Sequence, residues 1–543
     1  MCSLFGKFIF LASMLAHGVT VTPNVLSYPG ESITWTPCGE AENHTLECSS
    51  IDVPMDQFNV LSPGNQTFNI PLIRLRGRDA PEGRNLIVNP GGPGGSGLQY
   101  IYLKGAELNA IVGEGYHLVS FDPRGVNTSR PLASCYPDSQ SRQRLSQVRN
   151  VDPVLDSGEI FAWADNYAQA CADVMGEHGI YINTPQTAAD MNSILDALGQ
   201  DSMAYWGFSY GSLLGQTYAA LFPERSERII VDGIINIFNW YNGTVDHEMW
   251  TDTDTVFDGF FDECIKAGEN CALSEFGMGS KEVLKKRVMD LGDQLKDQPE
   301  SAYINSARYG LIDYQNLFHD AIFPVLFNPA SWYSFSQILA SFMNGNATTM
   351  FSVFGSDSSY TATDDANSIV HLNDAQTGPE YWPQDRKSFL DIILPGINSS
   401  KWAMIENVEY YKRQKWQLPK THTFLPTREI ATAHPILILS TTYDPVCPLK
   451  SARVARNAFK DSRIIEVKGY GHCSNSLPSS CLTAHVRDFL YNGTLPEKDV
   501  QCASEMEYFK PPTKRNISPQ INAEDDLRND LYIAHLRRKS RVW

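Results

Sequence analysis

Short apolar runs bounded by turn residues recur through the first part of the chain. The clearest runs cover residues 86–88, 117–121, 203–206 and 229–231. Runs of this length that are hydrophobic throughout are typical of strands buried on both faces of a sheet. Stretches with helical spacing lie between them, over residues 159–175, 187–198 and 212–221. The alternation predicts an α/β fold with a mostly parallel sheet covered by helices on both faces.

This alternation stops between residues 238 and 432. Longer amphipathic segments such as 281–295 and 314–327 replace the short runs, and the stretch around 355–365 is polar and loop-like. We interpret residues 238–432 as a helical lid inserted before the last strands of the sheet.

Strand-like runs return at residues 435–440 and 463–467, and a helix is expected over 482–491. The sheet is therefore expected to be interrupted by the lid and completed after it. The predicted parts are a signal peptide (1–20), the first part of the core (21–237), the lid (238–432), the second part of the core (433–512) and a polar tail (513–543).

The first 20 residues have the features of a secretory signal peptide. Lys7 precedes the apolar run 8–12, and the small residues Ala16 and Gly18 follow it. A membrane anchor is the alternative, but the run is about half of the roughly 20 residues that a membrane span needs. We therefore expect a secreted, extracellular protein without a membrane partner.

Composition and charge narrow the class of protein further. The 543 residues are 42% hydrophobic, which is enough to bury a large core and excludes a small disulfide scaffold or wholesale disorder. The net charge of −18 repels nucleic acids, so no nucleic-acid partner is expected.

Cysteine usage fits an oxidising compartment. Of the 11 cysteines, Cys2 would leave with the signal peptide, and the remaining ten form an even number. Proximity in the sequence favours three pairs and leaves two others: Cys38–Cys48, Cys264–Cys271 and Cys473–Cys481, with Cys135–Cys171 and Cys447–Cys502 as the remainder. The alternative is that some of these cysteines are buried thiols. No C-x-x-C pair indicates a zinc site, and neither a metal nor another cofactor is expected.

Eight asparagines stand in N-x-Ser/Thr acceptor sequences for glycosylation. They are Asn43, Asn65, Asn127, Asn242, Asn346, Asn398, Asn492 and Asn516. They suit a eukaryotic secreted protein, although a single such sequence can arise by chance and all would be meaningless in a bacterial protein.

The strongest chemical signal is the pentapeptide of residues 207–211, Gly-Phe-Ser-Tyr-Gly, between a predicted strand and a predicted helix. This G-x-S-x-G pattern is typical of a nucleophile elbow, in which glycines permit a tight turn that exposes the serine. Ser209 is therefore the candidate nucleophile. The alternative is an ordinary glycine turn between a strand and a helix.

A nucleophilic serine needs a base and an acid, which follow it in the order Ser, Asp or Glu, His in this kind of fold. Asp444 comes directly after the strand-like run 435–440, and His472 lies on a glycine-containing segment after the run 463–467. Both are at the carboxyl ends of strands, where the ligand sites of parallel sheets collect. Asp444 is the predicted acid and His472 the predicted base.

Other residues compete for these two roles. The alternative acid is Asp232, which also follows an apolar run directly. The alternative bases are His485, inside a helix-like segment, and His535, in the tail, and neither lies at a strand end.

Acyl transfer also needs N–H donors for the developing oxyanion. The backbone N–H of Tyr210 would supply one, because it follows the nucleophile. The glycine-rich segment 89–97 follows the run 86–88 and can approach a substrate closely, so Gly92 is the second predicted donor. A phosphate-binding loop is the alternative, but no Lys-Ser or Lys-Thr follows the glycines.

Six motifs together resemble secreted α/β-hydrolases related to prolyl iminopeptidase, especially the tripeptidyl aminopeptidase-like branch with its own C-terminal segment. The motifs are Val-Asn-Pro-Gly-Gly-Pro-Gly (88–94), Phe-Asp-Pro-Arg-Gly (121–125), Gly-Phe-Ser-Tyr-Gly-Ser (207–212), Val-Asp-Gly (231–233), Tyr-Asp-Pro (443–445) and Gly-His-Cys (471–473). The resemblance implies an α/β-hydrolase fold with a helical lid. It also implies the release of short peptides or single residues from free N-termini through an acyl-enzyme intermediate.

The resemblance assigns the same roles to Ser209, Asp444 and His472, with Gly92 and Tyr210 as the oxyanion donors. Arg124 is similar to a family arginine that is expected to brace the loops under the site, with a solvated surface arginine as the alternative.

The sequence also departs from the pattern of these relatives. Cys447 stands three positions after the acid, where relatives usually carry Thr, and Leu372 and Arg413 fall where many relatives have a pair of cysteines. These changes suggest a lost lid disulfide and weaken any transfer of substrate preference. The lid carboxylates that would hold a peptide N-terminus are open; the candidates are Asp252, Asp254 and Asp374, which are otherwise solvated acids.

These observations predict a serine aminopeptidase whose partner is a peptide substrate. The first alternative keeps the triad but hydrolyses a small ester, lactone or amide, such as a secondary metabolite. The second is a catalytically silent binding protein on a hydrolase scaffold.

Overall fold

A computed structural model describes residues 25–59, 65–80, 84–243, 245–355 and 362–511. The predicted signal peptide and the whole of the predicted tail (513–543), including Asn516, lie outside these residues. The other seven predicted glycosylation acceptors are described, and all are exposed. No helix in the described ranges is long and apolar enough to span a membrane.

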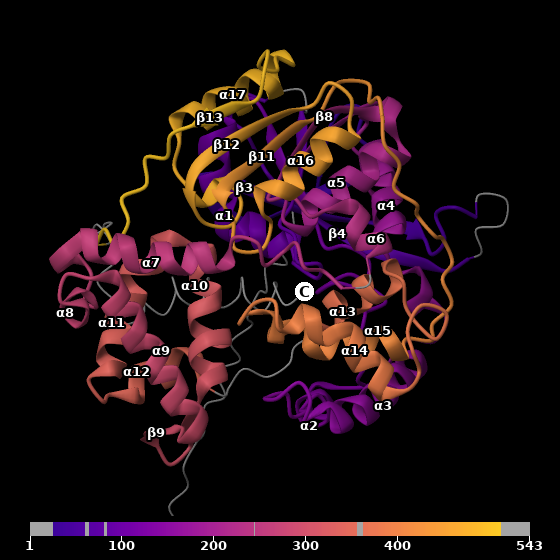
Figure 1. Cartoon of the computed structure of the whole chain (residues 1–543). Coiled ribbons are helices and arrows are strands. Elements are labelled where there is room, and N and C mark those ends of the chain that lie inside the picture. The colour runs from indigo at the N-terminus through magenta and orange to yellow at the C-terminus, as the bar shows by residue number, and fades with distance from the viewer. Residues whose placement is uncertain (1–24, 60–64, 81–83, 244, 356–361, 512–543) are drawn as a thin grey trace, which may run out of the picture.

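An eleven-stranded sheet organises the described part of the chain (Figure 1). Its strands in spatial order are β1 (Leu26–Ser27), β2 (Thr34–Ala41), β3 (His44–Pro54), β4 (Thr67–Leu75), β6 (His117–Phe121), β5 (Asn85–Asn89), β7 (Met203–Phe208), β8 (Ser226–Asp232), β11 (Leu437–Tyr443), β12 (Arg463–Tyr470) and β13 (Val500–Cys502). The strands from β6 to β13 run parallel to one another, and β1 to β4 add an antiparallel edge. The predicted mostly parallel sheet is confirmed.

Helices cover both faces of this sheet, as predicted. Apolar residues of α1 (Gly97–Val112) and α17 (Ser480–Asn492) share one buried cluster with one face of the strands. Those of α4 (Thr184–Ala197), α5 (Tyr210–Leu221) and α16 (Leu449–Ala458) belong to the cluster on the other face. The central strands β5, β6 and β7 are buried along their whole length, which explains their continuous hydrophobicity.

Between β8 and β11 the chain forms ten α-helices and a separate hairpin in the described residues. These are α6 (Ile237–Asn242), α7 (Thr253–Ala267), α8 (Ser274–Gly277), α9 (Lys281–Asp297), α10 (Phe323–Phe327), α11 (Trp332–Met343), α12 (Ala347–Phe354), α13 (Ala362–Asp374), α14 (Arg386–Ile397) and α15 (Asn407–Lys415), with the hairpin strands β9 (Glu300–Asn305) and β10 (Arg308–Ile312). Figure 1 shows α7 to α12 as one group and α13 to α15 as another. The second group packs on α3 (Ser157–Met175), which precedes α4, and α2 (Ser139–Leu145) lies beside it.

Several details differ from the sequence prediction. We expected a loop around residues 355–365, but α13 begins at Ala362, so the last part of this prediction is wrong. The expected helix at 314–327 contains a π-helical stretch, η4 (Asn316–Ile322), before α10. The antiparallel edge was not predicted, since strands such as β2 bury only a minority of their residues and lack a clear hydrophobic pattern.

The disulfides correct two of the predicted cysteine pairs. Cys38–Cys48, Cys135–Cys171 and Cys264–Cys271 are bonded as expected. The fourth disulfide joins Cys481 on α17 to Cys502 on β13. The predicted pairs Cys473–Cys481 and Cys447–Cys502 are therefore wrong, and Cys447 and Cys473 are buried thiols. The reason is the sheet: β13 pairs with β12 and brings Cys502 to α17, whereas the Cys473 thiol points at the carbonyl of Asp232.

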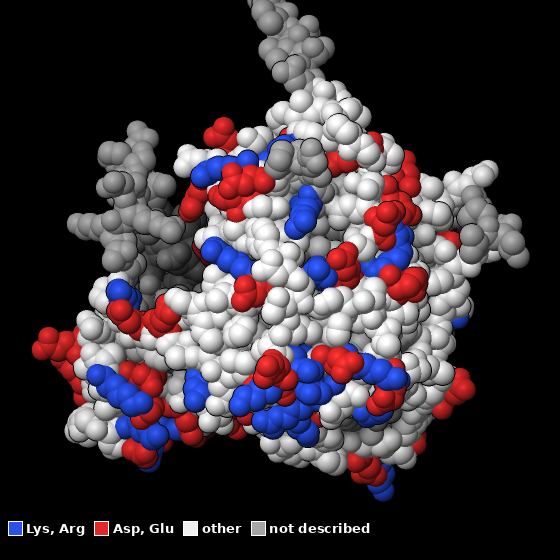
Figure 2. All heavy atoms as spheres, turned by 90° about the horizontal axis from the view of Figure 1, so that it is seen from above, with Lys and Arg blue, Asp and Glu red and all other residues white. Residues whose placement is uncertain are grey.

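Charged side chains are mixed over the surface seen in Figure 2. Lys and Arg lie beside Asp and Glu across this face, so it presents no continuous basic surface.

Candidate active site

The turn that carries Ser209 joins β7 to α5. Ser209 has φ 57° and ψ −121°, a conformation that non-glycine residues rarely adopt, and α5 begins at the next residue. A Cβ at Gly207 would lie 2.1 Å from the carbonyl oxygen of Gly211, and a Cβ at Gly211 would lie 2.6 Å from that of Asn89. Only glycine fits at both positions, so the local geometry is that of the predicted nucleophile elbow.

The imidazole of His472 lies against the carboxylate of Asp444. Its Nδ1 is 2.9 Å from both carboxylate oxygens, and both side chains are buried. The backbone N–H groups of Val446 and Cys447 donate to one oxygen of Asp444 at 3.0 and 2.8 Å, and that of Cys473 donates to the other at 2.9 Å. The carboxylate is thereby fixed in position, and it orients the ring so that Nε2 faces away from the acid.

Ser209 and His472 line one cavity of about 390 Å³. The three predicted triad residues therefore come from three separate strand ends of the sheet and meet at one site: Ser209 after β7, Asp444 after β11 and His472 after β12. The alternative base His485 lies on α17, within the helix that covers the sheet, and His535 lies outside the described residues.

The glycine-rich segment after β5 lies against the elbow. A Cβ at Gly91 would be 3.1 Å from the backbone nitrogen of Tyr210 and 2.9 Å from the Cβ of Ser209. The next residue is Gly92, which is buried and has φ 115°. This close approach requires glycine at position 91, and it places the segment that contains Gly92 beside the backbone N–H of Tyr210.

A polar cluster holds the far end of this glycine segment. Ser96 caps α1 by accepting a hydrogen bond from the Gln99 N–H, and its hydroxyl donates to Asp122 at 2.6 Å. Asp122 also accepts from the side chains of Thr128, at 2.6 Å, and Asn127, at 2.8 Å. The side-chain amide nitrogen of Asn127, an exposed residue and a predicted glycosylation acceptor, is thus already hydrogen-bonded within the protein.

Asp232, the alternative acid, binds a different residue from the predicted acid Asp444. It is fully buried and accepts hydrogen bonds from the N–H of Ser474, at 2.7 Å, and from its hydroxyl, at 2.6 Å. Burial raises the pKa of Asp232 to about 6, and the nearby Asp444 carboxylate acts in the same direction. The carboxylate that contacts His472 is that of Asp444, so Asp232 supports the segment after the histidine instead.

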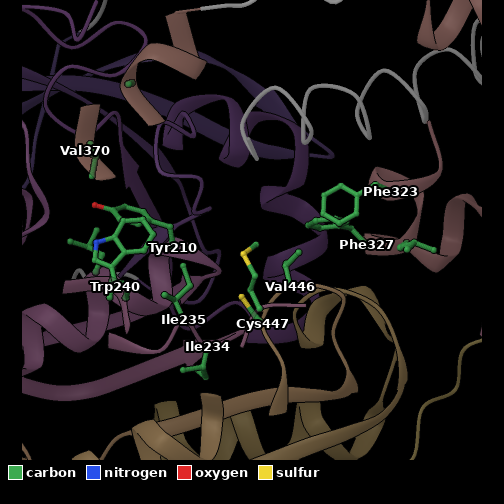
Figure 3. Close-up of a cluster of buried hydrophobic side chains, with 14 of the residues drawn as sticks. Tyr210, Ile234, Ile235, Trp240, Phe323, Phe327, Val370, Val446 and Cys447 are labelled. Carbon is green, nitrogen blue, oxygen red and sulfur yellow. The ribbon is translucent and has the colours of Figure 1, made fainter. Parts of the chain in front are cut away.

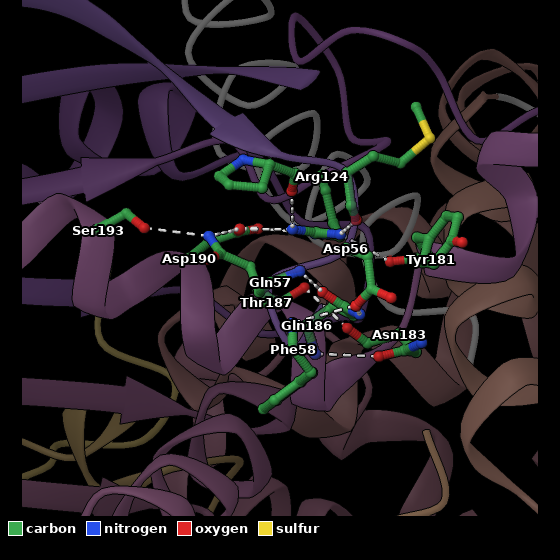
Figure 4. Close-up of polar contacts among 12 residues, drawn as sticks. Asp56, Gln57, Phe58, Arg124, Tyr181, Asn183, Gln186, Thr187, Asp190 and Ser193 are labelled. Carbon is green, nitrogen blue, oxygen red and sulfur yellow. Dashed lines mark hydrogen bonds and ion pairs between the residues drawn. The ribbon is translucent and has the colours of Figure 1, made fainter. Parts of the chain in front are cut away.

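Arg124 is fully buried, so the alternative of a solvated surface arginine is wrong, and Figure 4 shows its polar contacts. Its guanidinium binds both oxygens of Asp190 on α4, at 2.5 and 2.7 Å. It also donates to the backbone carbonyls of Met55, at 2.8 Å, and Tyr181, at 3.0 Å. Arg124 therefore ties α4 to the segment that precedes it and to Met55, directly after β3, and so acts as a brace between these segments.

Two of the three lid carboxylates already have partners. Asp254 binds Lys401 and accepts from the indole N–H of Trp402 at 3.0 Å. Asp374 accepts from the hydroxyl of Thr184, at 2.5 Å, and from the indole N–H of Trp240, at 2.8 Å. Burial raises the pKa of Asp374 to about 6, against the effect of these hydrogen bonds.

Asp252, the third candidate, is half-buried. It precedes α7, and burial together with the charge of Asp444 raises its pKa to about 6. It is the carboxylate of the three that interacts electrostatically with the triad acid.

Of the two positions where a pair of cysteines was expected in relatives, Arg413 makes a polar contact and Leu372 is buried. Arg413 on α15 lies 2.9 Å from Nε2 of His371 on α13, and that ring stacks on Trp240 at 4.1 Å between centroids. Leu372 is buried beside them. Trp240 in turn contacts the ring of Tyr210 (Figure 3). The contact connects α13 and α15 without a disulfide.

No sequence motif marks Phe327, the lid residue that lies against the predicted base His472. Its backbone carbonyl accepts a hydrogen bond of 2.8 Å from the N–H of His472, and its ring packs edge-on against the imidazole with centroids 5.1 Å apart. In Figure 3, Phe323 and Phe327 lie on one side of Cys447, and Tyr210 and Trp240 lie on the other. Only the folded chain brings α10 to the histidine.

Two groups of side chains in the described residues have the spacing of metal ligands. One is Asp444, His472 and Cys473, in which the first two residues already pair with each other. The other is Cys481, His485 and Cys502, in which both cysteines are consumed by the disulfide. The donor set at each place is therefore already used by protein contacts.

Comparisons with known proteins agree with this geometry. The chain is 27% identical to a tripeptidyl aminopeptidase of Streptomyces lividans over 497 residues, covering 87% of this chain and 86% of the relative. It is 26% identical to the serine protease Hip1 of Mycobacterium tuberculosis over 496 residues, covering 87% and 91%. A carboxylesterase B of Mycobacterium tuberculosis is 26% identical over 526 residues, covering 92% and 96%.

The resemblance inferred from the motifs is thus confirmed at the level of hydrolases and serine peptidases. The family described as alpha/beta hydrolase fold matches residues 84–477, which include the elbow, the glycine segment and the Asp444–His472 pair. The chain belongs to the alpha/beta hydrolase fold family.

Proposed function

We propose that this protein is a secreted serine hydrolase that cleaves peptide bonds near free N-termini through an acyl-enzyme on Ser209. The observation that carries the proposal is the buried Asp444–His472 pair at the same cavity as a serine on a strained elbow. The similarity to a tripeptidyl aminopeptidase over most of both chains supports peptides as substrates.

In this mechanism Ser209 Oγ attacks the carbonyl carbon of the substrate, and His472 takes the hydroxyl proton on Nε2. Asp444 stabilises the imidazolium that forms, because its carboxylate is held against Nδ1. The N–H groups of Tyr210 and Gly92 stabilise the oxyanion. His472 then gives its proton to the leaving amine, and water hydrolyses the acyl-enzyme with the same groups.

Secretion is part of the proposal. Four disulfides in the described residues suit an oxidising compartment, and the leader sequence is that of a signal peptide. The half-buried carboxylate of Asp252, whose pKa is raised by burial and by the charge of Asp444, is our candidate for contact with a substrate amine.

Hydrolysis of a small ester, lactone or amide is the second candidate. Its support is the similarity, over 92% of this chain, to a protein named carboxylesterase B. The same triad serves both reactions, so the lid decides between them.

The two candidates are separated by a substrate panel. Tripeptides with a free N-terminus and a fluorogenic amine are compared with the same peptides after N-acetylation and with p-nitrophenyl esters, each with wild type and Ser209→Ala. Cleavage of the free peptides alone supports the aminopeptidase. Cleavage of esters without peptides would transfer the proposal to the ester hydrolase, and turnover by Ser209→Ala would reject both.

A further inference from the structure

A second cavity begins on the other side of Phe327 from the catalytic one. The catalytic cavity and an adjacent cavity of about 310 Å³ share this residue in their walls. The volume is at the lower end of the usual range for ligand pockets. Since the Phe327 ring packs on His472, the adjacent cavity starts one side chain away from the catalytic base.

This adjacent cavity has an apolar wall. It includes Val148, Trp163, Phe323, Pro324, Ile405 and Val408. They come from the segment after α2, from α3, from α10, from η6 (Ala403–Glu406) and from α15, so both groups of lid helices contribute to the wall.

Four regularly spaced residues connect the outer end of the adjacent cavity to the residue that packs on His472. Residues 315, 319, 323 and 327 are spaced by four along η4 and α10, and all four line the adjacent cavity. The first two, Gln315 and His319, also line an open cavity of about 640 Å³ on the outer side. The side chains therefore change from polar at the outer end to aromatic at the triad.

The two charged residues that α15 contributes to the wall, Glu409 and Lys412, form an ion pair with each other. Lys412 lies 2.5 Å from Glu409, and the hydroxyl of Ser368 bonds both, at 2.9 Å to the amine and 3.1 Å to the carboxylate. All three side chains are buried. The third charged residue of the wall, the half-buried Asp320, accepts a hydrogen bond of 3.0 Å from the side-chain amide of Asn316. A charged substrate group would have to disrupt the arrangement of Lys412, Glu409 and Ser368 at a high desolvation cost, whereas an apolar group would not.

From these contacts we propose that the cavity behind Phe327 binds an apolar side chain on the acyl part of the substrate and makes the enzyme prefer such substrates. The occupant follows from the shared wall at Phe327, which places this cavity next to that of Ser209, and from the apolar residues of the wall. The inference rests on the proposed function, because it assigns the cavity to the substrate of that same site.

The test narrows the cavity and measures selectivity. Val408→Trp fills the wall opposite α10, and Val148→Trp narrows the cavity from another segment. Val174→Trp, on the exposed side of α3, is the matched control with the same change of residue. The substrates are free Ala-Ala-Ala fluorogenic peptide and its three versions with one Ala replaced by Phe, and labelling of Ser209 by a fluorophosphonate checks that each variant is folded.

Wild type should cleave at least one Phe peptide with a kcat/KM about tenfold above that of Ala-Ala-Ala, since a well-filled apolar pocket gives discrimination of this order. Val408→Trp and Val148→Trp should each reduce that ratio to about one, and Val174→Trp should leave it as in wild type. A wild-type ratio of one, or ratios that the cavity variants change no more than the control does, would overturn the inference.

Failure of the proposed function gives a different result. If esters are cleaved but peptides are not, the peptidase proposal fails. The cavity is then tested by comparing kcat/KM for p-nitrophenyl octanoate with that for p-nitrophenyl acetate. Val408→Trp should then lower the octanoate-to-acetate ratio about tenfold. An unchanged ratio would overturn the cavity assignment in that case as well.

Discussion

The backbone N–H of Ser209 donates a hydrogen bond of 2.8 Å to the backbone carbonyl of Asp232. The side chain of the same aspartate holds Ser474, two residues after His472, through two hydrogen bonds. Asp232 therefore links the elbow of the nucleophile to the segment of the base, although it touches neither reacting group. Its location at the end of β8, between β7 and β11, makes this link possible.

Asp232→Ala should lower kcat by about tenfold with little change in KM, because the lost hydrogen bonds free the segment that carries the base. Asp232→Asn should retain most of the activity, since a neutral side chain still accepts from Ser474. Steady-state kinetics of both variants check this. Equal loss of activity in the two variants would contradict the positioning role.

The pKa of Asp232 also predicts a pH dependence of stability. The folded state raises this pKa to about 6, so between pH 4 and 6 the folded protein binds the proton and the unfolded chain releases it. The contribution of Asp232 therefore falls as pH rises through this window, by about 3 kcal/mol. Urea titrations of Asp232→Asn and of wild type measure the two free energies of unfolding. The value for the variant minus the value for wild type should rise by that amount between pH 4 and 7. A difference that stays constant with pH would refute this prediction.

Much of the fold and of the site was predictable because the signals are local. The elbow, Asp444 and His472 each follow a buried strand within a few residues, and parallel strands bring their carboxyl ends to one edge. The pairing of Cys502 with Cys481 was not predictable, since it depends on β13 joining the sheet beside β12. The contact between Phe327 and His472 was not predictable either, because the two residues lie far apart in the sequence.

The ion pair between Arg124 and Asp190 should contribute strongly to the free energy of unfolding. Arg124→Met leaves this carboxylate buried without its partner, at a cost of about 3–5 kcal/mol. Adding Asp190→Leu removes the buried charge and should recover more than half of the loss. Urea unfolding of the single and double variants measures the coupling; additive effects would argue against the bracing role.

The disulfide map can be checked by counting thiols. The mature chain without its leader should show two thiols after denaturation, those of Cys447 and Cys473, and almost none while folded, because both are buried. Replacing Cys481 and Cys502 together with Ala should lower the free energy of unfolding by about 3 kcal/mol. Peptide mapping that finds Cys473 bonded to Cys481 would contradict the map.

Asp444→Asn should keep the fold but lower kcat by about a thousandfold or more, since the amide cannot stabilise the imidazolium or fix its tautomer. Wild-type activity should rise with pH between 5 and 8, because His472 must be neutral to accept the serine proton. A pH-rate profile and circular dichroism of the variant test both statements. A flat profile would be incompatible with a histidine base.

The central claim is that Ser209 is the nucleophile. The most direct measurement treats the purified protein and its Ser209→Ala variant with a fluorophosphonate probe and locates the label by mass spectrometry. The account predicts one label per chain on the peptide that contains Ser209, and no label on the folded variant. Labelling of the variant at the wild-type rate, or a label on another residue, would contradict it.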